Sequence, residues 1–355
     1  MTKTIGRLIA SGVLAVLTGA MALLAKTCNE MFFSFYPALS RRLLGALASV
    51  TAFLPVAVWE LLVGVLAIWF VVSLILALGK RRFIRWLTGV LLIACILATC
   101  FVGSWGLNYY APKMQTSLGL PVREYTTAEL REAAIYYRDM ANETAALVQR
   151  DGDGVMADCA FDALAEQAGE GFAALSERYD CFNGSTARVK RLLLSDVYGK
   201  FGTTGIFVCL TGESGACTTA FSASLPFTMC HEIGHRMAFA REDEASFAGY
   251  LACEASERPE FRYSGYYSAF IYCINALYKV DAAAAREIRS GCCAELSADC
   301  AAAVEHYEKI ENEKAVETQD KVYDTYLKTF SVDSGVRSYG EVTDLLITWY
   351  FERLK

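Results

Sequence analysis

The sequence predicts a mainly helical protein, with N-terminal transmembrane helices followed by an α-rich domain that contains a small β element. Three observations support this fold class. Hydrophobic residues make up 54% of the 355 residues, three long uncharged stretches lie in the first third, and most of the charged residues follow in segments with helical spacing. The membrane region therefore covers residues 1–110 and the second domain covers residues 111–355.

The three apolar stretches have the length of membrane-spanning helices. They are residues 8–25, 61–78 and 87–105, and none contains a charged side chain. A hydrocarbon core of about 30 Å needs a helix of roughly 20 apolar residues. Buried core helices rarely stay uncharged over such lengths, so we predict about three transmembrane helices. The first stretch follows Lys3 and Arg7 as a secretory signal would, but it lacks a convincing cleavage site and is read as an uncleaved helix.

Basic residues around these stretches predict the orientation. Lys80, Arg81, Arg82 and Arg85 fill the short link between the second and third stretches, which places this link in the cytoplasm. The protein is then a multi-pass cell-membrane protein with its C-terminal domain outside the cytoplasm, and Trp105, Tyr109 and Tyr110 are candidates for an aromatic belt. Residues 29–55 read as an external loop with an interfacial helix. A further spanning element within residues 43–59 would invert the arrangement.

The charge distribution excludes one class of partner. Residues 1–110 hold two acidic and nine basic side chains, so the rest of the chain has 39 − 2 = 37 acids and 33 − 9 = 24 bases, a net charge of −13. A domain this acidic is not expected to bind nucleic acid, because phosphate contacts need clustered Lys and Arg. Ten of the thirteen cysteines follow residue 110 without a Cys-x-x-Cys pair, which predicts disulfides or buried thiols rather than a cysteine metal site.

Several segments of the second domain have recognisable patterns. Thr126 and Glu129 have the spacing of a capping box and begin a helix that runs towards Arg150. Residues 155–179 have helical spacing, and residues 205–210 have the composition of a strand. Residues 292–330 read as a charged surface helix.

The segment His231-Glu232-Ile233-Gly234-His235 carries the chemistry. Two histidines four residues apart lie on one helix face, so His231 and His235 can bind one metal ion, and Glu232 is placed to act as a general base. The pattern predicts Zn²⁺ as cofactor and a peptide or protein as substrate. Pro226 begins this helix, and the apolar residues that follow it predict that the helix is buried.

A catalytic zinc site usually has a third protein ligand. The segment Arg241-Glu242-Asp243-Glu244 follows after a short turn, and a second helix beginning there can return either Glu242 or Glu244 to the metal. His306, the third histidine, lies in the charged helix and is read as a surface residue. Four residues of one segment are candidates for stabilising a developing negative charge, namely Arg262, Tyr263, Tyr266 and Tyr267.

Two resemblances sharpen these expectations. The segment Glu242, Ala245, Ser246 resembles the second helix of gluzincin peptidases, a zincin-like fold in which the Glu is the third ligand. That likeness implies Glu242, with Ser246 in place of the usual Asp or Asn beside a ligand histidine. Nearly the whole chain resembles the bacterial membrane family called domain of unknown function 3810, on the motifs Phe35-Tyr36-Pro37, Thr211-Gly-Glu213-Ser214, Leu225 to Glu232, Phe239 to Ala245, Arg262-Tyr263-Ser264 and Ser338-Tyr339-Gly340.

The leading hypothesis is therefore a membrane-anchored zinc metallopeptidase with His231, His235 and Glu242 as ligands and Glu232 as base. The alternative is a non-catalytic metal-binding sensor or structural protein in the lipid bilayer. Glu232 favours the first hypothesis, because a purely structural zinc site has no need for a general base.

Overall fold

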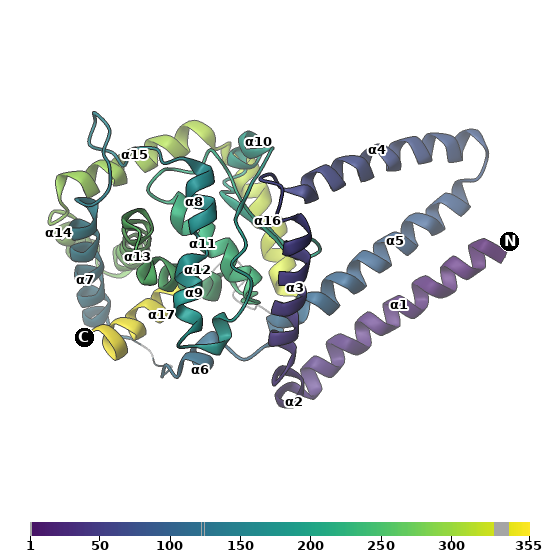
Figure 1. Ribbon diagram of the computed structural model, residues 1–355, viewed down its shortest axis with the longest axis horizontal. Coiled ribbons are helices and arrows are strands. Elements are labelled where there is room, and N and C mark those ends of the chain that lie inside the picture. The colour runs from purple at the N-terminus through teal and green to yellow at the C-terminus, as the bar shows by residue number, and fades with distance from the viewer. Residues whose placement is uncertain (1, 122, 124, 330–340) are drawn as a thin grey trace.

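The computed structural model describes residues 2–121, 123, 125–329 and 341–355, and it places three long helices on one side of a helical body (Figure 1). These helices are α1 (Thr2–Thr27), α4 (Val58–Gly79) and α5 (Phe83–Ser104). Each is long and apolar enough to cross a membrane, and they are the three such helices among the described residues. These helices confirm the prediction that the three apolar stretches form helices of membrane-spanning length.

The basic ends of the long helices lie far from the body. Figure 1 shows the N-terminal end of α1 and the turn between α4 and α5 at the tips remote from the body. The Arg7 guanidinium there donates a hydrogen bond of 2.7 Å to the Arg85 carbonyl. The clustered cations at Lys80–Arg85 and the body are therefore separated by the length of the apolar helices.

The segment before α4 contributes α2 (Asn29–Phe33) and α3 (Tyr36–Thr51), and α3 runs across the ends of the long helices (Figure 1). One face of α3 is buried with helical spacing, at Tyr36, Ser40, Leu44 and Ala48. The Ser40 hydroxyl donates to the Ser104 carbonyl at 2.7 Å, which fixes α3 against the last residue of α5. The further spanning element considered for residues 43–59 does not form, because α3 ends at Thr51.

The body is built mainly from helices. The predicted capping box is confirmed, since Thr126 and Glu129 reciprocally cap the helix that begins at Thr127. Among the described residues, the helices of the body are η1 (Gly106–Tyr110), α6 (Met114–Leu118), α7 (Thr127–Ala145), α8 (Phe161–Gln167), α9 (Glu170–Ser176), η2 (Asp180–Phe182), α10 (Ser195–Lys200), α11 (Leu225–Arg236), α12 (Glu242–Ala255), α13 (Pro259–Val280), α14 (Ala282–Arg289), α15 (Ala294–Ile310), α16 (Glu313–Thr329), α17 (Val342–Trp349) and η4 (Tyr350–Leu354).

Two predicted helices are each divided. The helix expected over residues 155–179 begins only at Phe161 and is interrupted between α8 and α9. Gly169 precedes α9, and a side chain at this position would lie 2.5 Å from the Thr186 carbonyl, so only glycine fits between the two helices. The helix expected over residues 292–330 is interrupted at Asn312, whose side chain accepts the Ala315 amide at 3.1 Å and starts α16 in a new direction.

The small sheet has the strand order β1 (Lys190–Arg191), β3 (Glu213–Ala216), β2 (Gly205–Val208). Strand β1 is parallel to β3, whereas β2 is antiparallel to it, with Gly205 opposite Ala216 and Val208 opposite Glu213. The strand predicted from residue 205 is confirmed, and β2 is an edge strand whose outer side is unpaired in this sheet. It lies beside α11.

Two buried carboxylates join the sheet region to the start of α4. Glu213 accepts the backbone amides of Val58 and Trp59 at 3.1 and 3.0 Å, satisfying amides that the first helical turn leaves free. Glu60, in the first turn of α4, accepts the amides of Leu193 and Leu194 at 2.7 and 3.0 Å. The hydrogen bonds accepted by Glu213 and Glu60 fix the direction in which α4 leaves the body.

The cysteines form no disulfide among the described residues, which include all thirteen of them. Of the two predicted outcomes, disulfides or buried thiols, the structure therefore contains thiols. Cys230, Cys253 and Cys273 lie in the main hydrophobic core, where burial raises the pKa of the Cys273 thiol and keeps it protonated and inert.

Gly171→Ala is expected to destabilise the body. The added methyl group would lie 1.9 Å from the Ala252 carbonyl, where α9 packs against α12, so the two helices would have to separate. Overpacking of this kind costs about 1–3 kcal/mol. A thermal unfolding scan of the full chain should show a clearly lower Tm, whereas Gly152→Ala, which meets nothing within 4 Å, should leave it unchanged. Equal Tm values for both variants would contradict this packing.

Candidate metal centre

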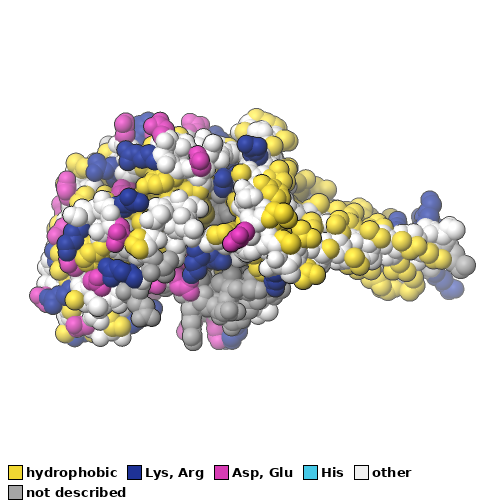
Figure 2. Space-filling model, turned by 90° about the horizontal axis from the view of Figure 1, so that it is seen from below, with side chains coloured by type: hydrophobic (Ala, Val, Ile, Leu, Met, Phe, Trp, Pro, Cys, Tyr) yellow, Lys and Arg dark blue, Asp and Glu magenta, His cyan; other side chains and the backbone are white. Residues whose placement is uncertain are grey.

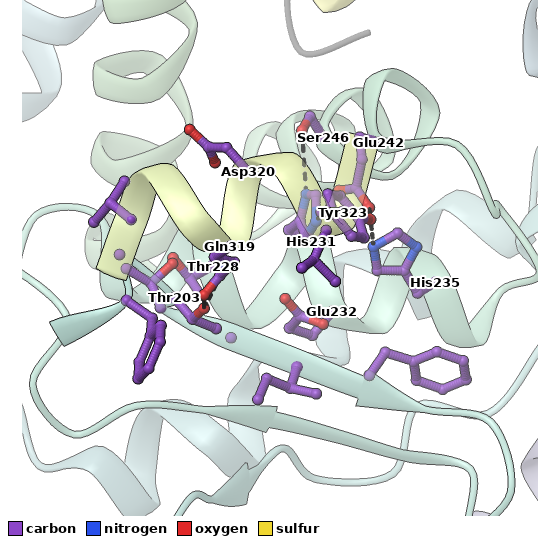
Figure 3. A pocket seen from close by; sticks show the side chains of 18 of the residues that line it. Thr203, Thr228, His231, Glu232, His235, Glu242, Ser246, Gln319, Asp320 and Tyr323 are labelled. Atoms are coloured by element: carbon purple, nitrogen blue, oxygen red, sulfur yellow. Dashed lines mark hydrogen bonds and ion pairs between the residues drawn. The ribbon is translucent and has the colours of Figure 1, made fainter. Parts of the chain in front are cut away.

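Helix α11 carries the motif histidines on one face. The helix starts at Leu225 with Pro226 in its first turn, as predicted, and all of its residues are buried except His231. The His231 and His235 rings lie 4.8 Å apart between centroids. The Nε2 atoms of both rings face the Glu242 carboxylate (Figure 3).

A tight turn brings the chain back to this position. Ala238 ends α11 with a left-handed φ of 72°, and the Phe239 amide reaches back to the Gly234 carbonyl at 3.3 Å. Left-handed residues commonly terminate helices in this way, although Ala pays a steric cost that Gly would not. The turn is short enough for Glu242, the first residue of α12, to lie directly beside the two histidines.

Glu242 closes the cluster. Its Oε2 lies 3.2 Å from His231 Nε2, and its Oε1 lies 3.5 Å from His235 Nε2. The three side chains each offer one ligand atom within 4.8 Å of the others, and among the described residues they form the group that could hold a metal ion. Ligands about 2.0–2.1 Å from a tetrahedral zinc are about 3.3 Å from one another. The two separations between Glu242 oxygens and imidazole nitrogens are close to this value.

The outer nitrogens of both imidazoles have fixed partners. His235 Nδ1 lies 2.8 Å from the Phe239 carbonyl, which can only accept a hydrogen bond, so Nδ1 carries a proton and Nε2 is the nitrogen that faces Glu242. His231 Nδ1 lies 3.2 Å from the Ser246 hydroxyl, and Tyr272 donates to the same hydroxyl at 3.4 Å. These partners orient the rings as outer-shell groups do in metal sites.

The pKa shifts of the cluster indicate a carboxylate that favours positive charge beside it. Burial pulls the pKa of His235 down, but the Glu242 carboxylate outweighs burial and raises it to about 9. Burial likewise raises the pKa of Glu242, and the two histidines reverse this and hold it well below its usual range. A cation that replaces the shared proton would satisfy the same atoms, which is the chemistry expected of a ligand set.

Glu232 lies beside the cluster and faces the sheet. Burial raises the pKa of its carboxyl group, while the two motif histidines lower it. The carboxylate occupies the space above Gly205 of β2, since a methyl group at that glycine would lie 2.5 Å from Glu232 Oε1. The Ser214 hydroxyl donates to the Glu232 carbonyl at 2.7 Å and so joins β3 to the motif helix.

The other candidate ligands lie elsewhere. Glu244 points away from the histidines and accepts the Met114 amide at 2.8 Å and an Arg241 nitrogen at 3.2 Å. His306 is half-buried rather than a surface residue, because its Nε2 pairs with the Thr219 carbonyl at 2.8 Å and its ring packs against Phe221. Of the two acids left open by the reasoning from residues, Glu242 is the one near the imidazoles.

The residues expected to stabilise an oxyanion do not reach the site. Tyr263 donates to the buried Asp299, which also pairs with Arg150 at 2.5 Å. Tyr266 and Tyr267 belong to the main core. The described residues that line the cleft include none of the four candidates, Arg262, Tyr263, Tyr266 and Tyr267. This prediction is therefore wrong. The helical spacing of these aromatic residues reflects packing of α13.

The cleft in front of the cluster has a volume of about 1050 Å³. One wall is β2 with Gly205, Ile206 and Phe207, and another is the inner face of α16 (Figure 3). The expectation that α16 is simply a solvated surface helix is therefore wrong. Its outer face has the exposed pair Glu317 and Lys321, but its inner face closes over the site.

Two residues that the sequence reasoning did not assign to the site contact it directly. Tyr323 of α16 donates its hydroxyl hydrogen to Glu242 Oε1. Trp105, the first residue after α5, donates its indole N–H to the His235 carbonyl at 3.2 Å. The spacing of Val316, Gln319 and Tyr323 on one face of a charged helix was the signal available in the sequence, and the structure half-buries all three. Trp105 and Tyr109 are buried here and do not form a free aromatic belt.

The fold and this site define a class of protein: a mainly helical protein with apolar N-terminal helices, a small sheet and a His-His-Glu cluster able to bind a metal. The chain belongs to the family described as protein of unknown function (DUF3810), whose model matches residues 34–347. This match confirms the resemblance noted from the motifs. No curated protein and no solved structure matches the chain.

Metal content is expected to depend on Glu242 and not on Glu244. Removing one ligand should lower affinity by more than the roughly 10–100-fold that loss of an outer-shell partner costs. Full-length protein purified in detergent should retain bound zinc as the parent and as Glu244→Gln, whereas His231→Ala and Glu242→Gln should lose it, as measured by mass spectrometry of the metal. Loss in Glu244→Gln with retention in Glu242→Gln would contradict the ligand set.

Proposed function

We propose that this protein is a membrane-anchored, zinc-dependent metallopeptidase that hydrolyses peptide bonds. The observation that carries the proposal is the position of Glu232. Its buried carboxylate lies next to the His231, His235 and Glu242 cluster and lines the same open cleft. A ligand set, an adjacent base and a cleft of this size form the arrangement that metal-assisted hydrolysis needs.

The residues have separate roles in this proposal. Zinc held by His231, His235 and Glu242 would lower the pKa of a coordinated water towards neutrality and polarise the substrate carbonyl. Glu232 takes a proton from the attacking water and returns it to the leaving amine. Its raised pKa suits the first of these steps, because a carboxylate of higher pKa is a stronger base towards the water proton than one of ordinary acidity.

The edge strand β2 supplies the substrate-binding surface of the proposal. Its outer side is unpaired in the sheet, and its residues Gly205, Ile206 and Phe207 line the cleft. An extended peptide can pair with such an edge through its backbone, so the peptide amides meet strand carbonyls while side chains alternate into and away from the cleft. Pairing next to Gly205 brings a peptide bond close to Glu232.

The same proposal places the body outside the cytoplasm. The basic turn Lys80–Arg85 and the start of α1 lie at the tips remote from the body. Positive residues flanking apolar spans favour the cytoplasmic side, so three spans leave the body on the other side. The test fuses a reporter that is active only in the cytoplasm after Lys355. Activity of this reporter would contradict the placement.

Glu232→Gln is expected to abolish turnover while leaving the metal bound. The amide keeps the shape of the side chain but cannot accept the proton, and general acid–base groups contribute about 10²–10⁴-fold to rate. The test compares cleavage of a degenerate fluorogenic peptide library by the full-length parent and by the variant, each with its zinc content measured. Equal cleavage by both proteins would end the peptidase proposal.

Gly205→Ala is expected to displace Glu232 without removing a ligand. The new methyl group would lie 2.5 Å from Glu232 Oε1, so the carboxylate must move. A shift of about 1 Å in a reacting group can cost about 100-fold in rate. Turnover should fall by this order with zinc content retained, and Thr211→Ala in the same hairpin should behave as the parent. Full activity in Gly205→Ala would place the base elsewhere.

A further inference from the structure

We infer that the cleft takes its substrate from the membrane surface: a polypeptide anchored in the same bilayer and cut within a few residues of the lipid. This inference depends on the proposed peptidase function for its chemistry. Its geometric basis is separate, because it rests on where the long apolar helices end relative to the metal cluster.

The end of α5 forms part of the cleft. Phe101, inside this apolar helix, and Trp105, directly after it, both line the cleft. The Trp105 ring lies 6.0 Å from the His235 ring and 5.9 Å from the Phe101 ring. A helix of 22 residues is about 33 Å long, close to the thickness of a hydrocarbon core, so Ser104 lies near the lipid headgroups when α5 spans the bilayer. The Trp105 ring then lies between the cluster and the level of the headgroups.

Exposed apolar side chains surround the same end of the body. The outward face of α3 exposes Leu39 and Val50 by 54% and 69%, and Phe53 after it is 79% exposed. The segment that includes α10 and precedes β2 adds Leu193, Leu194, Val197 and Phe201. Figure 2 shows hydrophobic side chains on the body next to the long helices, whereas charges of both signs cover its opposite end. Continuity with three apolar helices points to lipid as the partner of this face.

The direction of β2 connects the cleft to this face. Gly205 lies against Glu232, and three residues later the strand ends at Val208, followed by Cys209, which packs in one cluster with Leu44 and Trp105. Three residues of strand span about 10 Å. A peptide paired along β2 therefore extends from the general base towards the end of α5 in a few residues, which sets a short distance between the cut and the substrate's own membrane anchor.

The test of the substrate class uses the full chain in vesicles of phosphatidylethanolamine and phosphatidylglycerol. The probe is one degenerate fluorogenic octapeptide library, either free or attached to an apolar 20-residue membrane anchor through spacers of 2, 6, 12 or 20 residues. We expect the tethered library with short spacers to be cleaved at least tenfold faster than the free library or the 20-residue spacer, and only when Glu232 is intact.

Each other outcome has a separate meaning. Cleavage that depends on Glu232 but is equal for free and tethered libraries overturns this inference and leaves the proposed function standing. No cleavage that depends on Glu232, with either library, overturns both. Phe53→Asp should reduce cleavage of the tethered library alone, and Val280→Asp, an exposed apolar position at the end of α13, should have no effect.

A measurement without turnover checks the membrane-facing surface by itself. An environment-sensitive fluorescent amino acid is incorporated in place of Phe53 or Val280 in the full chain, and brominated lipids are added to the vesicles. We expect strong quenching at position 53 and little at position 280, because the helix that follows Val280, α14, lies at the opposite end of the body (Figure 1). Equal quenching at the two positions overturns the inference.

Discussion

The Glu242 carboxylate between two imidazoles is the contact on which the rest of the site depends. Its two oxygens lie 3.2 and 3.5 Å from the two Nε2 atoms, in a buried place that also contains Glu232. Two carboxylates without a cation would repel each other where water cannot screen them. The outer hydrogen bonds of both histidines turn their Nε2 atoms towards Glu242. The three side chains thus form a cluster that could hold a cation.

The long helices and the site are parts of one structure rather than an anchor joined to a separable domain. Trp105 links the end of α5 to the carbonyl of a motif histidine, and α3 packs between α5 and the sheet region. Glu213 and Glu60 fix α4 in the same way on the other side. A fragment that begins after residue 110 would lack Phe101, Trp105 and Tyr109, which line the cleft, so the site is complete only in the full chain.

The sequence was informative where chemistry depends on short spacing. The motif, Glu242 at the start of the following helix, the three apolar stretches and the capping box at Thr126 each lie within one helix or across one turn, and the structure has them as expected. Whether Glu242 or Glu244 faces the histidines depends on the left-handed turn at Ala238, which no residue pattern announces. Tyr323 and Trp105 come from segments 81 and 130 residues away from their partners, so only the tertiary fold brings them to the site.

The tyrosines of α13 show why a pattern of residue types can mislead. Tyr263 belongs to a buried network with Asp299 and Arg150, in which each polar group is satisfied by another. Tyr323, in a helix that looked solvated, instead holds the oxygen of Glu242 that faces His235. Amphipathic spacing identifies the inner face of a helix, but it does not say whether that face covers a core or a cleft.

The burial of Glu232 bears on the choice between a catalytic and a structural metal site. Burial disfavours its charged form, and the two neighbouring histidines offset this only in part, so keeping a carboxyl group there costs stability. A site that served only to hold the fold together would gain nothing from this cost, and an apolar side chain of similar size would pack as well. Groups that reduce stability without a structural return are characteristic of active sites. For this reason the burial of Glu232 supports the proposal that the protein is an enzyme.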